Sequence, residues 1–109
     1  QHTSELLQQN YSLQDEWDQV RARISSALAD YERARQQAVL FESGIIPQAR
    51  QTVASMPAGY QVNKVDFLNL VRSQITLFNY ETQYWRALSE ANQSLAKLAA
   101  AVGKEAIHE

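Results

Sequence analysis

Apolar residues recur through the first half of the chain at alternating intervals of three and four positions. Such spacing, sustained for about five heptads, is typical of a coiled coil. Several members are alanines, so a partner helix can approach closely there. The two rows are Leu6, Leu13, Val20, Ala27, Ala34 and Phe41, and Trp17, Ile24, Tyr31, Ala38 and Ile45. The pattern predicts one long helix.

A second helical pattern begins at Asp66 and is broader than the first. Its three apolar rows are Leu70, Leu77, Tyr84, Ala91 and Leu98; Val71, Phe78, Trp85, Asn92 and Ala99; and Leu88, Leu95 and Val102. Gly103 is a residue type favoured just after a helix end, and Lys104 suits the C-terminal carbonyls. We therefore expect a second helix of about 37 residues, ~55 Å long, with a frayed tail over residues 104–109.

The stretch between the two patterns is dense in turn-forming residues. Gly59 and Asn63 tolerate a left-handed backbone conformation. Asp66 is a good N-cap, and Val65 and Leu70 have the spacing of a hydrophobic staple around it. The sequence predicts a tight tip near residues 58–66, and therefore an all-α, long antiparallel helical hairpin.

The first helical pattern is disturbed around Gly44 and Pro47. A proline inside a helix removes a hydrogen bond and costs about 3 kcal/mol. The apolar residues from Phe41 to Val53 run at intervals of four, which is a stutter in the coiled-coil repeat. The residues leave two outcomes open, a kinked continuous helix or a break followed by a short helix over residues 47–56. Pro57 should end or bend the helix near Met56.

Length and composition indicate one small helical segment, residues 1–109, without a second domain. The net charge is −2, cysteine is absent, and no apolar run approaches the ~20 residues of a membrane helix. An acidic balance of this kind argues against nucleic-acid binding. The N-terminus neither begins with Met nor resembles a signal peptide, so we expect a piece of a longer protein.

No constellation of catalytic or metal-ligating residues is recognisable. His2 and His108 lie near the chain ends, where we expect solvent-exposed side chains. Asp15, Glu16 and Asp18 lie on the polar side of the repeat and are interpreted as a solvated face. The sequence therefore predicts no enzyme activity, no metal site and no cofactor.

Aromatic side chains mostly fall in the apolar rows. Trp17, Tyr31, Tyr84 and Trp85 are expected to pack in a core or interface. Tyr60 lies at the tip, where both packing and a hydroxyl bond to a neighbouring helix pair stay open. Since a two-helix hairpin buries one seam only, the broad face of the second helix predicts self-association.

Three ordered motifs carry a resemblance to a known family. They are Gly44–Thr52, with its Ile-Pro-Gln-Ala; Tyr60–Leu70, with its Asp-Phe-Leu; and Leu98–Gly103, ending in Val-Gly. In order and spacing they resemble the C-terminal part of the TolC-like outer-membrane efflux proteins, over roughly Val20–Gly103. The segment Thr76–Glu81 is similar to the branch that works with heavy-metal cation pumps.

This resemblance implies a homotrimeric channel with a β-barrel in the outer membrane of a Gram-negative bacterium and an α-helical tunnel across the periplasm. The chain would be the last hairpin of one protomer, and its first helix would continue, kinked, through Pro47. The tip would dock to the periplasmic adaptor protein, which joins the channel to an inner-membrane pump. The docking residues would be Gly59, Tyr60, Val62, Asn63, Lys64, Val65, Asp66 and Phe67.

The tunnel entrance is where the chain departs from the family pattern. Asn63 replaces the usual tip glycine, and Asn69 and Arg72 stand where the family often has aspartates. Tyr60, Asn69 and Arg72 are therefore the expected entrance residues, without an acidic ring. The alternative function is a soluble coiled-coil interaction or scaffold module.

Overall fold

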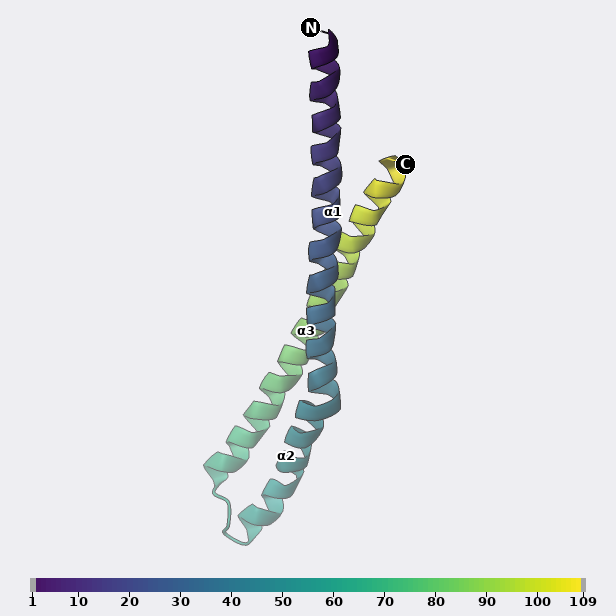
Figure 1. Ribbon diagram of the computed structural model, residues 1–109. Coiled ribbons are helices and arrows are strands. Elements are labelled where there is room, and N and C mark those ends of the chain that lie inside the picture. The colour runs from purple at the N-terminus through teal and green to yellow at the C-terminus, as the bar shows by residue number, and fades with distance from the viewer. Residues whose placement is uncertain (1, 109) are drawn as a thin grey trace. The chain divides into compact units, whose positions relative to one another are not determined.

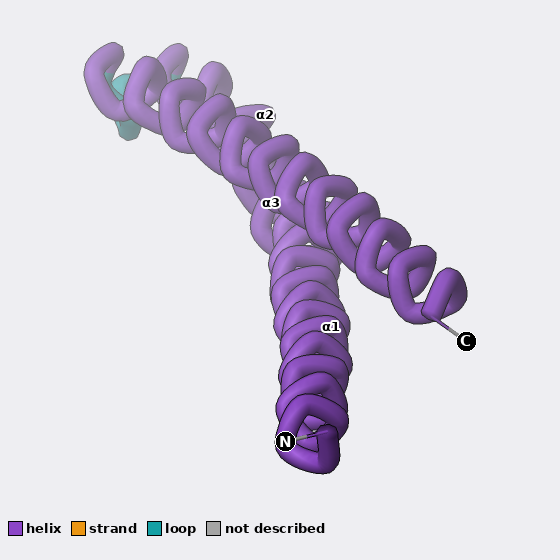
Figure 2. Tube along the Cα trace, turned by 90° about the horizontal axis from the view of Figure 1, so that it is seen from above, coloured by secondary structure: helices purple, strands orange, loops and turns teal. Residues whose placement is uncertain are grey.

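The computed structural model describes residues 2–108, without the side chains of His2, Glu105, Ile107 and His108. Helix α1 spans His2–Leu40, a π-helical turn spans Phe41–Ile45, α2 spans Ile46–Gln61 and α3 spans Phe67–His108 (Figure 1). The only non-helical segment among the described residues is the connection between α2 and α3, coloured teal in Figure 2. The prediction of an all-α helical hairpin is confirmed.

The chain divides into two compact units, each containing a stretch from both arms of the hairpin. The tip unit comprises residues 33–90, and the end unit comprises residues up to 32 and from 91 onward. The tip unit contains the π-helical turn, α2 and the first part of α3. It therefore contains all the predicted docking and entrance residues.

In the end unit, the buried positions are almost all small. Val20 and Ala27 of α1 are buried, as are Ala91, Ser94 and Ala101 of α3. Small side chains let two helix backbones approach closely, so this seam is narrow. Leu6 and Leu13, which continue the row toward the N-terminus, are more than half exposed. Their prediction as seam residues is wrong, because α1 extends beyond the last turn of α3 there (Figure 1).

In the tip unit, buried positions follow the heptad spacing on both arms, except for a step of five residues from Phe41 to Ile46 on the first arm. The first arm contributes the buried residues Ala34, Ala38, Phe41 and Ile46, and the half-buried Ala49, Val53 and Met56. The second arm contributes Leu70, Ser73, Leu77, Tyr80, Tyr84 and Ala87. The row from Leu70 through Leu77 and Tyr84 was expected. The row from Ser73 through Tyr80 and Ala87 lies beside it in the seam, in place of the neighbouring apolar row of Val71, Phe78 and Trp85.

This replacement follows from where the first arm lies. Phe78 and Trp85 are about two-thirds exposed, whereas Ala87 is almost wholly buried. An apolarity count favours aromatic residues for the core, but a close helix pair selects the small residues on the facing side. Trp85 is therefore not part of the buried seam of the single chain, and its packing in an interface stays a prediction.

Near Pro47 the first arm is continuous and contains a wide turn. The N–H of Ile46 donates to the carbonyl of Phe41, five residues back, and α2 follows without a gap. Proline stands in the first turn of α2, where a missing N–H is tolerated. The ribbon changes direction after this turn (Figure 1), as helices do at prolines and π-bulges. Of the two outcomes left open, the structure has the kinked helix.

Helix ends differ from the expectations at two further places. Helix α2 passes through Pro57 and ends at Gln61, so residues 58–61 are helical and the connection is shorter than expected. Half-buried Met56 and Gly59 face the seam on either side of that proline. Packing along the arm outweighs the local cost of about 3 kcal/mol.

The second helix also extends beyond its expected end. Helix α3 continues through Gly103 to His108, so Gly103 is not a C-cap and residues 104–108 are helical. A glycine inside a helix costs only about 1 kcal/mol relative to alanine. The buried Ala101 nearby shows that seam packing is still present in the final turns.

Candidate functional site

The tip closes α2 with a Schellman motif. Asn63 has a φ of 62°, the only positive φ of a non-glycine residue in the described part of the chain. The N–H of Lys64 donates to the Gly59 carbonyl at 2.8 Å, and the N–H of Asn63 donates to the Tyr60 carbonyl at 3.1 Å. These two bonds satisfy the last carbonyls of a helix whose next residue is left-handed. Of the two residues expected to tolerate that conformation, only Asn63 adopts it.

Gly59 has a different role, which is close approach. A Cβ on Gly59 would lie 2.6 Å from Cγ2 of Val65, closer than such atoms pack. The N–H of Val65 also donates to the Gly59 carbonyl, at 3.2 Å. Val65 therefore folds back over the last turn of α2. It is half-buried, and its role as a docking residue stays a prediction.

Asp66 begins α3 as the sequence predicts. Its carboxylate Oδ1 accepts from the N–H of Asn69 at 2.8 Å, the N-cap geometry. Its carbonyl accepts from the N–H of Leu70 at 3.2 Å. Val65 and Leu70, the expected staple pair, are both half-buried. With both helix ends capped, the connection is an ordered turn.

Exposed side chains at the tip form its outer surface. Val62 is 61% exposed, and Tyr60 and Phe67 are also exposed, with ring centroids 6.3 Å apart. Lys64 is exposed beside them. The tip thus combines apolar groups and one cation on a rigid turn. Asn69 and Arg72, the expected entrance residues, are exposed on the first turns of α3.

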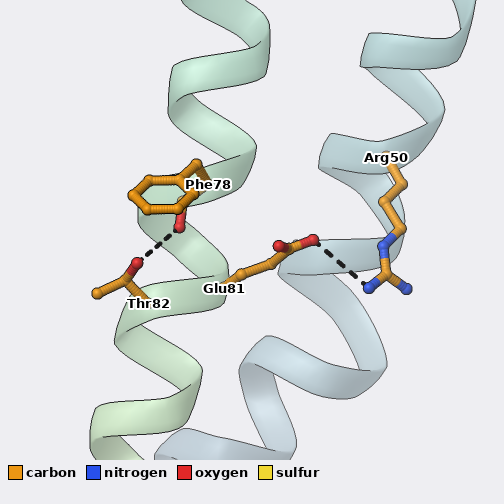
Figure 3. A network of polar contacts seen from close by, with 4 residues as sticks. All are labelled: Arg50, Phe78, Glu81 and Thr82. Atoms are coloured by element: carbon orange, nitrogen blue, oxygen red, sulfur yellow. Dashed lines mark hydrogen bonds and ion pairs between the residues drawn. The ribbon is translucent and has the colours of Figure 1, made fainter.

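Polar contacts join the two arms above the tip. Arg50 of α2 lies 3.5 Å from a carboxylate oxygen of Glu81 on α3, and Figure 3 shows the two side chains reaching across the gap between the ribbons. Because Arg50 is well exposed, solvent screens the pair and its contribution is small. In the same view the Thr82 hydroxyl donates to the Phe78 carbonyl one turn earlier.

A second contact joins the π-helical turn to α3. The Tyr84 hydroxyl donates to a carboxylate oxygen of Glu42 at 3.4 Å. Burial raises the pKa of Tyr84 above its ordinary value of 10.0, and the Glu42 carboxylate raises that pKa further by charge and by hydrogen bonding. The ring of Phe41 packs at 6.2 Å from that of Tyr80. The first two residues of the wide turn are therefore both in contact with α3.

Between α2 and α3 an open groove of about 530 Å³ carries mostly hydroxyl and amide groups. Its lining consists of Ile45, Gln48, Ala49, Thr52, Ser73, Thr76 and Tyr80. The Thr52 and Ser73 hydroxyls donate to the carbonyls of Gln48 and Leu70. None of the lining side chains is charged, so the groove has no evident catalytic or ion-binding chemistry.

Away from the seam, α3 carries a second apolar face within the tip unit. We call it the outer stripe; it consists of Phe67, Ile75, Phe78 and Trp85, all more than half exposed. With half-buried Val71 between Phe67 and Ile75, the stripe runs at intervals of four, four and three residues to Phe78 and resumes two turns later at Trp85. Intervals of three and four are those of an interhelical seam. A contiguous apolar face of this kind marks an interaction surface.

Within the described residues, no three His, Cys, Asp or Glu side chains come together as metal ligands. No helix in that part of the chain is long and apolar enough to cross a membrane. The side chains of His2 and His108 lie outside the described residues. The groups that stand out are thus the tip turn and the outer stripe.

Comparisons with known proteins bring no match. No family model, no curated protein and no solved structure matches this chain. The resemblance to the TolC-like family therefore depends on the sequence motifs alone, and the function it implies stays a prediction.

Proposed function

We propose that this chain is a periplasmic tunnel segment of a trimeric outer-membrane efflux channel in a tripartite heavy-metal or drug export system. The observation that carries the proposal is the tip, capped at both helix ends, with an exposed Val62 on it. An apolar side chain held outward by a fixed turn suits docking better than packing. The partner at this tip is the adaptor protein, which connects the channel to an inner-membrane pump.

The outer stripe supports the same proposal. Phe78 and Trp85 expose large apolar areas, and neighbouring helices of the tunnel wall and of further protomers would cover them. Tyr60, Asn69 and Arg72 would stand at the tunnel entrance. Such a segment conducts without catalysis, and the pump selects the substrate.

The test uses the full-length protein in cells that depend on it for resistance. Val62→Asp places a charge on the docking surface and should weaken adaptor cross-linking and efflux, with normal amounts of trimer in the outer membrane. The matched control is Leu40→Asp, the same kind of change at a 57% exposed position away from the tip. Full resistance with Val62→Asp would show that the tip is only a turn.

The alternative is a soluble coiled-coil scaffold, which would use the outer stripe without the tip. In that case both charge substitutions would leave export unaffected, while Trp85→Glu would abolish binding of the partner helix. The sequence flanking this segment separates the two functions directly. A signal peptide and two helix–strand–strand–helix repeats would identify the channel.

A further inference from the structure

The first arm of the tip unit contains one residue more than its heptad pattern allows. Ala34, Ala38 and Phe41 are buried at intervals of four and three residues. A regular continuation would bury Ile45, Gln48, Thr52 and Ser55. The seam instead uses Ile46, Ala49, Val53 and Met56, each one position later, and Gln48, Thr52 and Ser55 are exposed. Ile45, inside the wide turn, is half-buried beside Ile46.

The π-helical turn Phe41–Ile45 takes up this extra residue. Its defining bond, from the N–H of Ile46 to the Phe41 carbonyl, spans five residues where an α-helical bond spans four. One added residue would otherwise rotate everything after it by about 100°. The opposite arm has no interruption, since its seam positions from Leu70 to Ala87 keep the three–four spacing throughout.

We propose that this turn is a register-setting device. It fixes the rotation of α2 about its axis, and it is placed by the buried seam and not by Pro47. By setting that rotation it decides which side chains the tip half of the hairpin turns toward α3 and which it displays. The inference goes beyond the proposed function, because it holds whatever the tip binds.

Moving the turn in either direction would bury polar groups. One turn nearer the N-terminus, Val39 and Glu42 would replace Ala38 and Phe41 in the seam, and the carboxylate would lose its solvent. Nearer the tip, Gln48 and Thr52 would replace Ala49 and Val53. The hydrophobic pattern changes phase only between Phe41 and Ile46, so that is where the extra residue is held.

Local contacts fit a turn at this position. Gly44 has open space around it, with nothing within 4 Å of an added Cβ. The Ser43 hydroxyl, inside the wide turn, donates to the carbonyl of Val39 in the last turn of α1 at 2.7 Å. Glu42 reaches Tyr84, and Arg50 reaches Glu81. The first contact comes from the turn itself and the second from α2, so the second depends on the rotation of α2.

Deletion of a single residue tests this role of the π-helical turn. The deletions are made in the Pro47→Ala variant, because the proline ring would clash with a restored α-helical turn. Deletion of Gly44 should convert the wide turn into α-helix and leave the seam in phase, so the Tm should stay within about 4 °C of the parent. Deletion of Gln51, equally exposed on the same arm, puts the rest of α2 out of phase and should lower the Tm by about 8 °C or more. Equal losses from the two deletions would overturn the proposal.

A structure of the Pro47→Ala variant alone separates the two causes of the turn. If the seam places it, the Ile46 N–H will still bond to the Phe41 carbonyl. A return to the α-helical bond to Glu42 would show that proline makes the turn, and the proposal would be wrong. Neither outcome bears on adaptor docking, which the Val62→Asp test addresses separately.

Discussion

The two arms of the tip unit solve the same packing problem in different ways. The second arm, part of α3, is one unbroken helix with a regular seam and an exposed outer stripe. The first arm has two prolines, a π-helical turn and only one buried face. Where the arms face each other, both nevertheless present buried or half-buried residues at matching intervals.

The difference shows that the backbone hydrogen bonding of a coiled-coil arm can vary locally, whereas the direction of its apolar face is kept. Hydrogen bonding in the first arm deviates locally, at Pro47 and Pro57, while the apolar face stays turned toward α3. A lost or lengthened backbone bond costs a few kcal/mol at one place. A seam out of phase would lose apolar burial at every following turn, about 25 cal/mol per Å².

Substitutions on the two faces of α3 should differ most in their effect on stability. Ala87 is 2% exposed and faces the first arm, whereas Trp85 is 66% exposed. Ala87→Glu buries an unpaired charge and should lower the free energy of unfolding by about 3 kcal/mol or more. Urea denaturation followed by circular dichroism measures this loss.

Trp85→Glu is the matched substitution on the other face. It should leave the stability of a single chain almost unchanged but reduce self-association, which sedimentation at micromolar concentration detects. A wild-type chain that sediments as a monomer would contradict the expectation that the outer stripe is covered by other helices.

Alanine substitutions at two glycines of the first arm should have the next largest difference in stability. A methyl group at Gly59 meets Val65 at 2.6 Å, so Gly59→Ala should destabilise the tip by about 1–3 kcal/mol through overpacking. Gly44→Ala is the control, because open space surrounds that position. It should stabilise the arm by about 0.5–1 kcal/mol. Equal effects at the two sites in thermal melts would show that Val65 does not lie over Gly59 in solution.

The left-handed turn residue should have a smaller effect. Asn63→Val forces a β-branched side chain into φ 62° and should cost about 1–2 kcal/mol. Asn63→Gly adopts the same conformation without strain and should match the wild type or exceed it slightly. Hydrogen exchange of the Lys64 amide, which donates to Gly59, reports the loosening directly. Unchanged protection in Asn63→Val would contradict the Schellman motif.

The Tyr84–Glu42 contact gives the smallest expected effect, and it depends on pH. The pKa of Tyr84 is raised in the folded state by burial and by the carboxylate. Its contribution to stability is thus complete below the ordinary pKa of 10.0 and is lost as pH rises through the folded-state value. The wild type should therefore lose stability at high pH faster than Tyr84→Phe. Parallel pH–stability curves for the two proteins would contradict this.

Much of the fold could be predicted from the spacing of apolar residues. A three–four repeat over many turns has one consistent solution, a long helix with a partner. The cap at Asp66 was also predictable, since its carboxylate bonds only to the next turn. The exposed position of Val62 followed from its place in a short connection. Each of these is local, or is repeated so often along the chain that single exceptions do not matter.

At several positions the tertiary structure differs from what local sequence preferences predict. Pro57 and Gly103 are helix-ending residue types, yet α2 and α3 continue through them. Ser73 and Ala87 entered the seam ahead of Phe78 and Trp85, because the distance between the arms admits small side chains. Val65 became a packing residue on Gly59, a contact between residues six positions apart. The physical reason is the same in each case: local preferences are worth about 1–3 kcal/mol, and packing along a whole helix face exceeds them.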